Sequence, residues 1–233
     1  MDGSHIKSSI DGLPDLQLDP GPHATCHWML PKLLAGSFPG DRTEPNHSAK
    51  VRSLLDGGVN TFICLQEHGE LKRFTPYVTT AETLRKSEST EFPDALEFFH
   101  CPIQDNDVTS DDQLLCALRT LVKKLLQGRG VYVHCWGGHG RTGTLICALL
   151  VTCYGLSPAE AEDLYNKAER LRGARNGIWP GSAVQREQVE RFAGRALDLD
   201  GPLLPPLEEP AVFAAPWVVS LEQTTWPARV TTR

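Results

Sequence analysis

Apolar residues recur along the chain with two different spacings, and short apolar runs alternate with longer segments in which every third or fourth residue is apolar. Short runs predict buried strands, and the longer spacing predicts helices with one apolar face. Strands are expected at residues 33–35, 59–65, 95–103 and 131–133. Helices are expected at residues 48–56, from 111 to just before Gly128, from about 141 to 154, from Pro158 onwards, and at 182–197.

The ends of the expected helices carry residues that satisfy free backbone groups. Ser110 and Gln113 have the spacing of a capping box, and Ser157 with Glu160 repeats it around Pro158. Residues 145–154 are apolar on every side, which is typical of a helix buried at the centre of a domain, and Gly155 follows as a stop signal. Strands therefore alternate with helices, which predicts an α/β fold with a central, mostly parallel twisted sheet flanked by helices.

The two ends of the chain differ in composition from the middle. Residues 1–27 scatter Pro, Gly and Asp without a sustained period and are interpreted as an N-terminal arm, ahead of a domain at 28–197. Residues 198–233 form a Pro-rich extension, with six prolines between 201 and 227. Proline removes a backbone donor, so this extension is expected to be neither regular helix nor central strand. It either packs its aromatic residues on the domain or docks a partner.

Composition narrows the function classes. The chain has 233 residues, of which 40% are hydrophobic and 22% charged, which excludes a collagen-like, disordered or coiled-coil protein. The net charge is 23 − 29 = −6, so nucleic-acid binding is not expected. No apolar run approaches the roughly 18 residues of a membrane span. Oligomeric state cannot be read from the sequence.

Seven cysteines, an odd number without regular spacing, do not form a disulfide scaffold, and no secretory or organelle signal is readable. A cytoplasmic or nuclear protein with reduced cysteines is therefore expected. His and Cys residues also lack the paired spacing of a zinc site, so neither metal nor cofactor is expected.

Most candidate catalytic residues lie in one segment, residues 131–144, where an apolar strand runs directly into a glycine-rich loop and then into the buried helix. Backbone N–H groups of such a loop and the positive end of the helix converge to form an anion-binding nest. Cys135 lies at the start of this loop, and the positive field favours its nucleophilic thiolate form. Arg141 follows six positions later, and its planar guanidinium suits two oxygens of a phosphoryl group.

His134-Cys135, five further residues, and then Arg141-Thr142 resemble the signature of the cysteine-dependent protein tyrosine phosphatase superfamily, in particular its compact dual-specificity-like members. The resemblance covers roughly residues 28–195. It implies the fold of that superfamily and hydrolysis of phosphomonoesters through a phosphocysteine. The loop residues expected to bind phosphate are Trp136, Gly137, Gly138, His139, Gly140 and Arg141.

The resemblance also implies roles for residues outside the loop. Asp105, in Pro102-Ile103-Gln104-Asp105, matches the general acid that lies about 30 residues before the nucleophile, with Asp107 as the alternative. Gln185 matches the glutamine that orients the hydrolytic water, although Ser182 and Gln185 also have capping-box spacing. Thr142 is expected to donate a hydrogen bond to the Cys135 sulfur, and His134 to orient the loop without acting as the base.

The substrate stays open between phosphotyrosine, with phosphoserine or phosphothreonine in addition, and a phosphoinositide or phosphosugar. Lipid phosphatases of the phosphatase-and-tensin type carry basic residues where this loop has Trp136 and His139. A module that binds a phosphorylated partner without turnover is the less favoured alternative, since Cys135, Arg141 and Asp105 are all present.

Two further features have open interpretations. Cys64 occupies a position where some relatives form a reversible disulfide with the nucleophile, but a buried core cysteine is the simpler reading. A basic run at the end of the helix after Pro158 is either a solvated face that complements the helix dipole or a rim that contacts an acidic substrate; it comprises Lys167, Arg170, Arg172 and Arg175.

Overall fold

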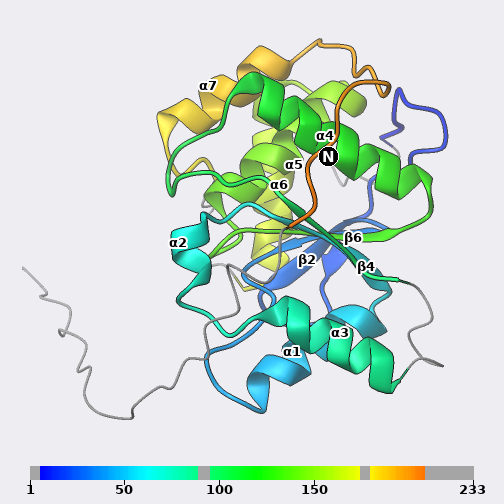
Figure 1. Cartoon of the computed structure of the whole chain (residues 1–233). Coiled ribbons are helices and arrows are strands. Elements are labelled where there is room, and N and C mark those ends of the chain that lie inside the picture. The colour runs from blue at the N-terminus through cyan, green and yellow to red at the C-terminus, as the bar shows by residue number, and fades with distance from the viewer. Residues whose placement is uncertain (1–5, 89–94, 174–178, 208–233) are drawn as a thin grey trace, which may run out of the picture.

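One sheet of six strands runs through the computed structural model, which describes residues 6–88, 95–173 and 179–207 (Figure 1). The spatial order is β1-β2-β3-β6-β4-β5; β3, β6, β4 and β5 run parallel, whereas β1 and β2 pair antiparallel at one edge. The strands are β1 (Asp19–Pro20), β2 (Cys26–Leu30), β3 (Leu33–Gly36), β4 (Val59–Cys64), β5 (Glu97–His100) and β6 (Gly130–His134). The predicted α/β class with a mostly parallel sheet is confirmed.

Helices cover both faces of this sheet (Figure 1). On one face lie α1 and α3, and on the other lie α4, α5, α6 and α7. Successive residues of β6 serve the two faces alternately: Val131 and Val133 join the core under α4 and α5, while Tyr132 joins the core under α1 and α3. The helices are α1 (Asn46–Asp56), α2 (His68–Leu71), α3 (Tyr77–Ser87), α4 (Asp111–Leu126), α5 (Gly140–Cys153), α6 (Pro158–Leu171) and α7 (Ala183–Phe192).

Helix α5 is buried along nearly its whole length, as predicted for its apolar residues from 145 onwards, and the burial extends to Arg141 and Thr142 in its first turn. It packs against α6 and α7 and carries the loop that follows β6. Gly143 allows this close packing, because a Cβ atom there would lie 2.3 Å from the Trp179 ring. The first turn of α5 is therefore held rigidly, and so is the end of the loop that precedes it.

The predicted helix starts are realised to different degrees. Ser157 and Glu160 form the complete capping box at α6. At α4, the Ser110 hydroxyl accepts a hydrogen bond from the backbone N–H of Gln113 at 3.2 Å, but the Gln113 side chain accepts from the Thr109 hydroxyl instead of returning to Ser110. Only half of that capping box forms.

Two element lengths were predicted wrongly. The strand expected at residues 95–103 is regular only over Glu97–His100, although Cys101 and Ile103 still donate backbone hydrogen bonds to Cys64 and Leu65. The helix expected at 182–197 ends at Phe192, because Ala193 turns to an extended conformation and Gly194 follows with a φ of 75°. The single-turn helix α2 and the 11-residue helix α3 were not predicted.

The described parts of both chain ends contact the central layers. Leu13 and Leu16 are buried in the core beside α5, and the Tyr154 hydroxyl donates to the Pro14 carbonyl at 2.6 Å. Near the other end, the Leu207 N–H donates to the Phe98 carbonyl at 2.8 Å, so residues 205–207 lie along the β5 edge of the sheet. The remaining Pro-rich residues, 208–233, lie outside the described residues, and the two interpretations of the extension stay predictions.

The carboxyl ends of the parallel strands meet at one level. In the register of the sheet, Gly36 lies beside His134, His134 beside Cys64, and Cys64 beside His100. The loops that follow these four strands therefore meet at a single edge, the place where ligands bind in open parallel sheets. Over the residues described, no helix has both the length and the apolar character that a membrane crossing requires.

Candidate active site

The loop between β6 and α5 forms the floor of the site. Cys135 follows the last residue of β6 and is only 3% exposed. The Gly138 N–H donates to the Cys135 sulfur over 3.3 Å, so at least one loop amide points inward, as the nest requires. Gly138 has a φ of 74°, and a Cβ atom there would lie 2.2 Å from the Gly36 backbone. Only glycine fits this turn of the loop against the end of β3.

Arg141 lies in the first turn of α5 and is 2% exposed, yet its guanidinium reaches the site. Its Nη1 and Nη2 atoms donate to the two carboxylate oxygens of Glu70, at 2.5 and 2.9 Å. Nη1 also donates to the Ile103 carbonyl at 2.9 Å, and Nη2 lies 3.0 Å from an Asp105 oxygen. These contacts fix the plane of the guanidinium beside the nucleophile.

Glu70 is a site residue that the sequence interpretation missed. It belongs to the single turn α2, which follows β4, and its side chain completes a capping box with Glu67. That box orients the Glu70 carboxylate, which is only 12% exposed, toward Arg141. A Glu-x-x-Glu spacing directly after a buried strand, at the edge where the loop lies, is the signal that would have identified it.

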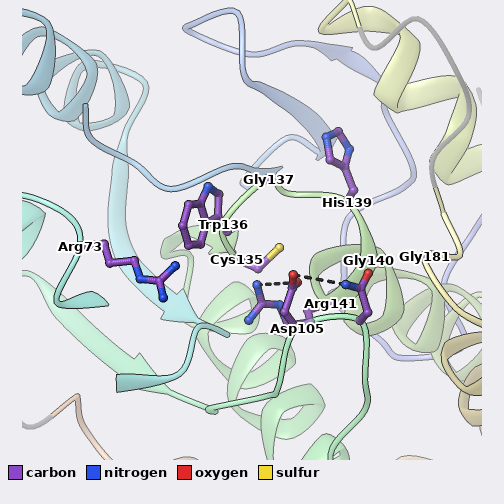
Figure 2. Close-up of a pocket in the computed structure, with 10 residues that line it drawn as sticks. Arg73, Asp105, Cys135, Trp136, Gly137, His139, Gly140, Arg141 and Gly181 are labelled. Carbon is purple, nitrogen blue, oxygen red and sulfur yellow. Dashed lines mark hydrogen bonds and ion pairs between the residues drawn. The ribbon is translucent and has the colours of Figure 1, made fainter. Parts of the chain in front are cut away.

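Asp105 lies on the loop that follows β5, the acid loop, and its side chain is 66% exposed. It lies opposite residues 135–139 between β6 and α5, which are termed the phosphate loop after their predicted role. Its neighbour Asn106, with a φ of 62°, donates to the second Asp105 oxygen at 3.3 Å. The carboxylate therefore lies at the mouth of the site next to Arg141 (Figure 2). Asp107, the alternative acid, accepts a hydrogen bond from the Val108 backbone instead.

Gln185 is fully buried in the first turn of α7 and lies against the phosphate loop. Its side chain accepts from the Gly181 N–H at 2.8 Å and donates to the Asp107 carbonyl at 3.3 Å, and it leaves no room for a Cβ atom on Gly140. The capping-box alternative is wrong, because the Ser182 side chain makes no cap hydrogen bond. Gln185 bridges the acid loop to the segment before α7.

His134 and Thr142 flank the nucleophile from inside the core. Burial lowers the pKa of His134 to about 3, so the imidazole is neutral near neutral pH, and its Nε2 lies 3.0 Å from the Tyr77 hydroxyl. The Thr142 hydroxyl is buried and has no hydrogen-bond partner among the described residues. The expected bond from Thr142 to the Cys135 sulfur is therefore absent from this structure.

A cavity of about 510 Å³ opens above Cys135 (Figure 2). Trp136 stands on one side of it, with the Arg73 guanidinium 5.7 Å from the centre of its ring, and His139 lies on the opposite side. Trp136 also packs edge-on against Phe74, which fixes the ring. The cavity thus combines the predicted nucleophile Cys135, the loop predicted to bind an anion, a carboxylate at the mouth and one exposed cation at the rim.

The interpretation of the basic run is wrong for Arg172. Its side chain is 4% exposed and neither faces solvent nor lines the cavity; it lies behind the phosphate loop, where it donates to backbone carbonyls. Arg170 is exposed, and Arg175 lies outside the described residues. Helix-end arginines are usually solvated, and only the tertiary contacts identify this one as internal.

Cys64 is completely buried at the end of β4, and burial raises its thiol pKa to about 12. This environment suits a core cysteine, and a disulfide with Cys135 stays a prediction. Within the described ranges, no group of three or more His, Cys, Asp or Glu side chains is arranged to hold a metal ion.

Comparison with known proteins identifies the family to which this chain belongs. Residues 23–190 match the family model described as Swiss Army Knife protein, DSP-PTPase phosphatase domain. A protein of Invertebrate iridescent virus 3 named as tyrosine phosphatase 067L is 30% identical over 105 residues, which are 41% of this chain and 44% of that protein.

The Schizosaccharomyces pombe phosphatidylinositol 3,4,5-trisphosphate 3-phosphatase ptn1 is 46% identical over 41 residues, which are 18% of this chain and 12% of that protein. The chain thus spans less than half the length of both curated relatives.

Solved structures share the same arrangement of elements. Kinase associated phosphatase with its catalytic cysteine replaced by serine has a TM-score of 0.55 at 18% identity, over 77% of this chain and 94% of that chain. A glycine-to-alanine mutant form of Tk-PTP has a TM-score of 0.53 at 20% identity, over 72% of this chain and 93% of that chain. At these identities the likeness establishes the fold.

Proposed function

Because the chain belongs to the family of DSP-PTPase phosphatase domains, we propose that it hydrolyses phosphate monoesters in two steps through a phosphocysteine on Cys135. One observation carries the proposal. The Cys135 sulfur accepts an amide hydrogen bond from its own loop, at the base of a cavity that also contains Arg141 and Asp105. A nucleophile, an anion cradle and an acid thus converge on one phosphoryl-sized position.

In the first step the phosphoryl oxygens occupy the loop amides and the Arg141 guanidinium, and the Cys135 thiolate attacks phosphorus. The S–P bond forms as the ester P–O bond breaks, and Asp105 donates its proton to the leaving oxygen. Preorganised donors stabilise the charge on the phosphoryl oxygens in the transition state. The position of Asp105 at the exposed mouth of the cavity that contains Cys135 supports this role.

In the second step water attacks phosphorus and the S–P bond breaks, returning the thiolate and releasing phosphate. Asp105 now accepts a proton from the water, and Gln185 orients it. The contact of Gln185 with Gly140 and with the acid loop supports this assignment. Thr142, whose buried hydroxyl has no partner in the part of the chain that the structure describes, supplies a donor to the departing sulfur after a rotation about χ1.

His134 serves as a positioning group. Its neutral imidazole is fixed between the Tyr77 hydroxyl and the backbone of Cys135, so it has no route to act as the base. The phosphate-binding residues are then Trp136 to Arg141, with Gly137, Gly138 and Gly140 giving their N–H groups and His139 at the N-cap position of α5.

The substrate is proposed to be a phosphorylated protein, with phosphotyrosine preferred because Trp136 offers a wall for an aromatic leaving group. Phosphoserine and phosphothreonine are accepted more slowly. A phosphoinositide is the second candidate, favoured by Arg73 at the rim and by the local match to ptn1. A phosphosugar, or binding without turnover, ranks below these.

The test is a substrate panel with two variants. Phosphotyrosine and phosphoserine peptides, a soluble inositol phosphate and a sugar phosphate are assayed for phosphate release with wild type, Cys135→Ser and Asp105→Asn. The proposal expects hydrolysis by wild type, none by Cys135→Ser, and retained phosphate-ester binding by Cys135→Ser. Wild-type rates in Cys135→Ser would overturn the mechanism, and preference for the inositol phosphate would select the second candidate.

A further inference from the structure

Three side chains from one end of α6 reach the outer side of the phosphate loop, the side away from Cys135. They are Tyr165 and Glu169 of α6 and Arg172 at its C-cap; they are spaced four and three residues apart, so they lie on one side of the helix. All three side chains are buried. None of them lines the cavity, so they do not touch a substrate bound there.

Arg172 and Tyr165 bind the carbonyls of the loop. The Arg172 guanidinium donates to the carbonyls of Gly137 and Gly138, each at 3.0 Å, and to Thr25 before β2 at the same distance. The Tyr165 hydroxyl donates to the Gly138 carbonyl at 2.7 Å. Burial raises the pKa of Tyr165 well above its usual range, so this hydroxyl remains a donor.

These bonds act on the nucleophile through the planar peptide unit. The carbonyl of Gly137 and the N–H of Gly138 belong to the same trans peptide and point in opposite directions. Arg172 binds that carbonyl from outside the loop, so the Gly138 N–H is turned inward, where it donates to the Cys135 sulfur at 3.3 Å. Binding the Gly138 carbonyl turns the next N–H, that of His139, by the same geometry.

Glu169 holds the arginine in place. It is fully buried, pairs with Arg172, and lies 2.7 Å from Nδ1 of His139 in the loop itself. Burying two charges carries a desolvation penalty, which their mutual attraction and further hydrogen bonds offset. Here Nη1 and Nη2 of the guanidinium donate to three backbone carbonyls and one carboxylate, and Nη2 also lies 2.6 Å from Nδ1 of His139, whereas Nε has no partner among the described residues.

We propose that Arg172, held by Glu169 and assisted by Tyr165, is a positioning residue that keeps the phosphate loop in its anion-binding conformation before a substrate arrives. The proposal rests on the proposed function only in taking a phosphoryl group as the bound anion. It deepens that function by assigning the orientation of the loop amides to a helix that contributes nothing to the cavity wall.

The experiment measures binding of tungstate, a non-covalent oxyanion, by calorimetry at a temperature well below the melting transition of each variant. Arg172→Met should weaken tungstate binding about tenfold or more, since hydrogen bonds from a charged donor are lost. Arg172→Lys should recover part of the affinity, because an ammonium keeps the charge but not the planar fork. Tyr165→Phe should weaken binding about threefold. Arg170→Met, a change of the same kind on the exposed side of α6, should leave it unchanged.

Tungstate affinity within twofold of wild type in folded Arg172→Met would overturn the proposal. Full recovery in Arg172→Lys would also overturn it, because charge alone would then suffice. Should Arg172→Met fail to fold, Tyr165→Phe decides, since it removes one hydroxyl and keeps the ring. Wild-type protein that binds tungstate but hydrolyses no ester in the panel would refute the proposed function. The tungstate affinities of these variants would then still test the positioning role of Arg172.

Discussion

The pair between Glu70 and Arg141 gives the sharpest mutational prediction. Glu70→Gln keeps the shape of the side chain but removes its charge and replaces one carboxylate oxygen by an NH₂ group. In the wild-type protein, Nη1 and Nη2 of Arg141 donate to the Glu70 carboxylate at 2.5 and 2.9 Å, and the pair is almost completely buried. The variant therefore loses one charge-assisted hydrogen bond and places an NH₂ group against a guanidinium.

The size of the loss in stability follows from the hydrogen bonds that Arg141 keeps in the variant. A hydrogen bond to a charged group contributes about 1.5–3 kcal/mol, and breaking a buried pair outright costs about 3–5 kcal/mol. Arg141 keeps the Ile103 carbonyl and Asp105 as acceptors, so the lower end applies: a loss of about 2 kcal/mol in the free energy of unfolding. With the guanidinium free to shift toward Asp105, kcat/KM should fall about 10- to 100-fold.

Urea unfolding and steady-state hydrolysis of an aryl phosphate measure the two effects. Glu187→Gln is the matched control, since Glu187 is exposed on α7 and away from the site. It should change neither quantity appreciably. The reasoning fails if Glu70→Gln retains kcat/KM within twofold of wild type, because Glu70 then does not orient Arg141.

Other predictions concern the acid, the water and pH. Asp105→Asn should lower kcat about 100-fold or more for an alkyl phosphate and much less for nitrophenyl phosphate, whose leaving group needs no proton, as parallel assays will show. Gln185→Ala should release leaving group in a burst followed by slow turnover, visible in stopped flow; linear kinetics would contradict its role. Burial lowers the pKa of His27 to about 3, below its usual 6.5, so at mildly acidic pH the unfolded chain binds a proton at His27 and the folded chain does not. The contribution of neutral His27 to the free energy of unfolding is complete above pH 6.5 and is lost as pH falls toward 3, by about 2 kcal/mol at pH 5. His27→Leu should therefore flatten the melting temperature between pH 7 and pH 5 relative to wild type.

The sequence predicts those parts of the fold whose signals are local. Residues 131–133 are a continuous apolar run and residues 59–65 a mostly apolar one, so the central parallel strands are recognisable, and the apolar residues 145–153 of α5 identify the middle of the domain. The phosphate loop is recognisable for the same reason, since its glycines, Cys135 and Arg141 lie within a few residues.

Contacts between distant segments could not be read in this way. Glu70 and Arg141 are 71 residues apart, and α2 is a single turn without an apolar period. Arg172 looked like part of a solvated basic run because nothing in its neighbourhood marks it as buried; its partners Thr25 and Gly137 come from other elements. Such residues act through tertiary contacts, which the order of residues does not display.

Detection of the phosphocysteine tests the central claim most directly. Gln185→Ala is mixed with an aryl phosphate, quenched in acid within the burst, digested, and examined by mass spectrometry. A phosphoryl group on the peptide that contains Cys135, absent from the same peptide of Cys135→Ser treated identically, is the predicted result. Release of leaving group in a burst with that peptide unmodified, or continued hydrolysis by Cys135→Ser at the wild-type rate, would contradict it.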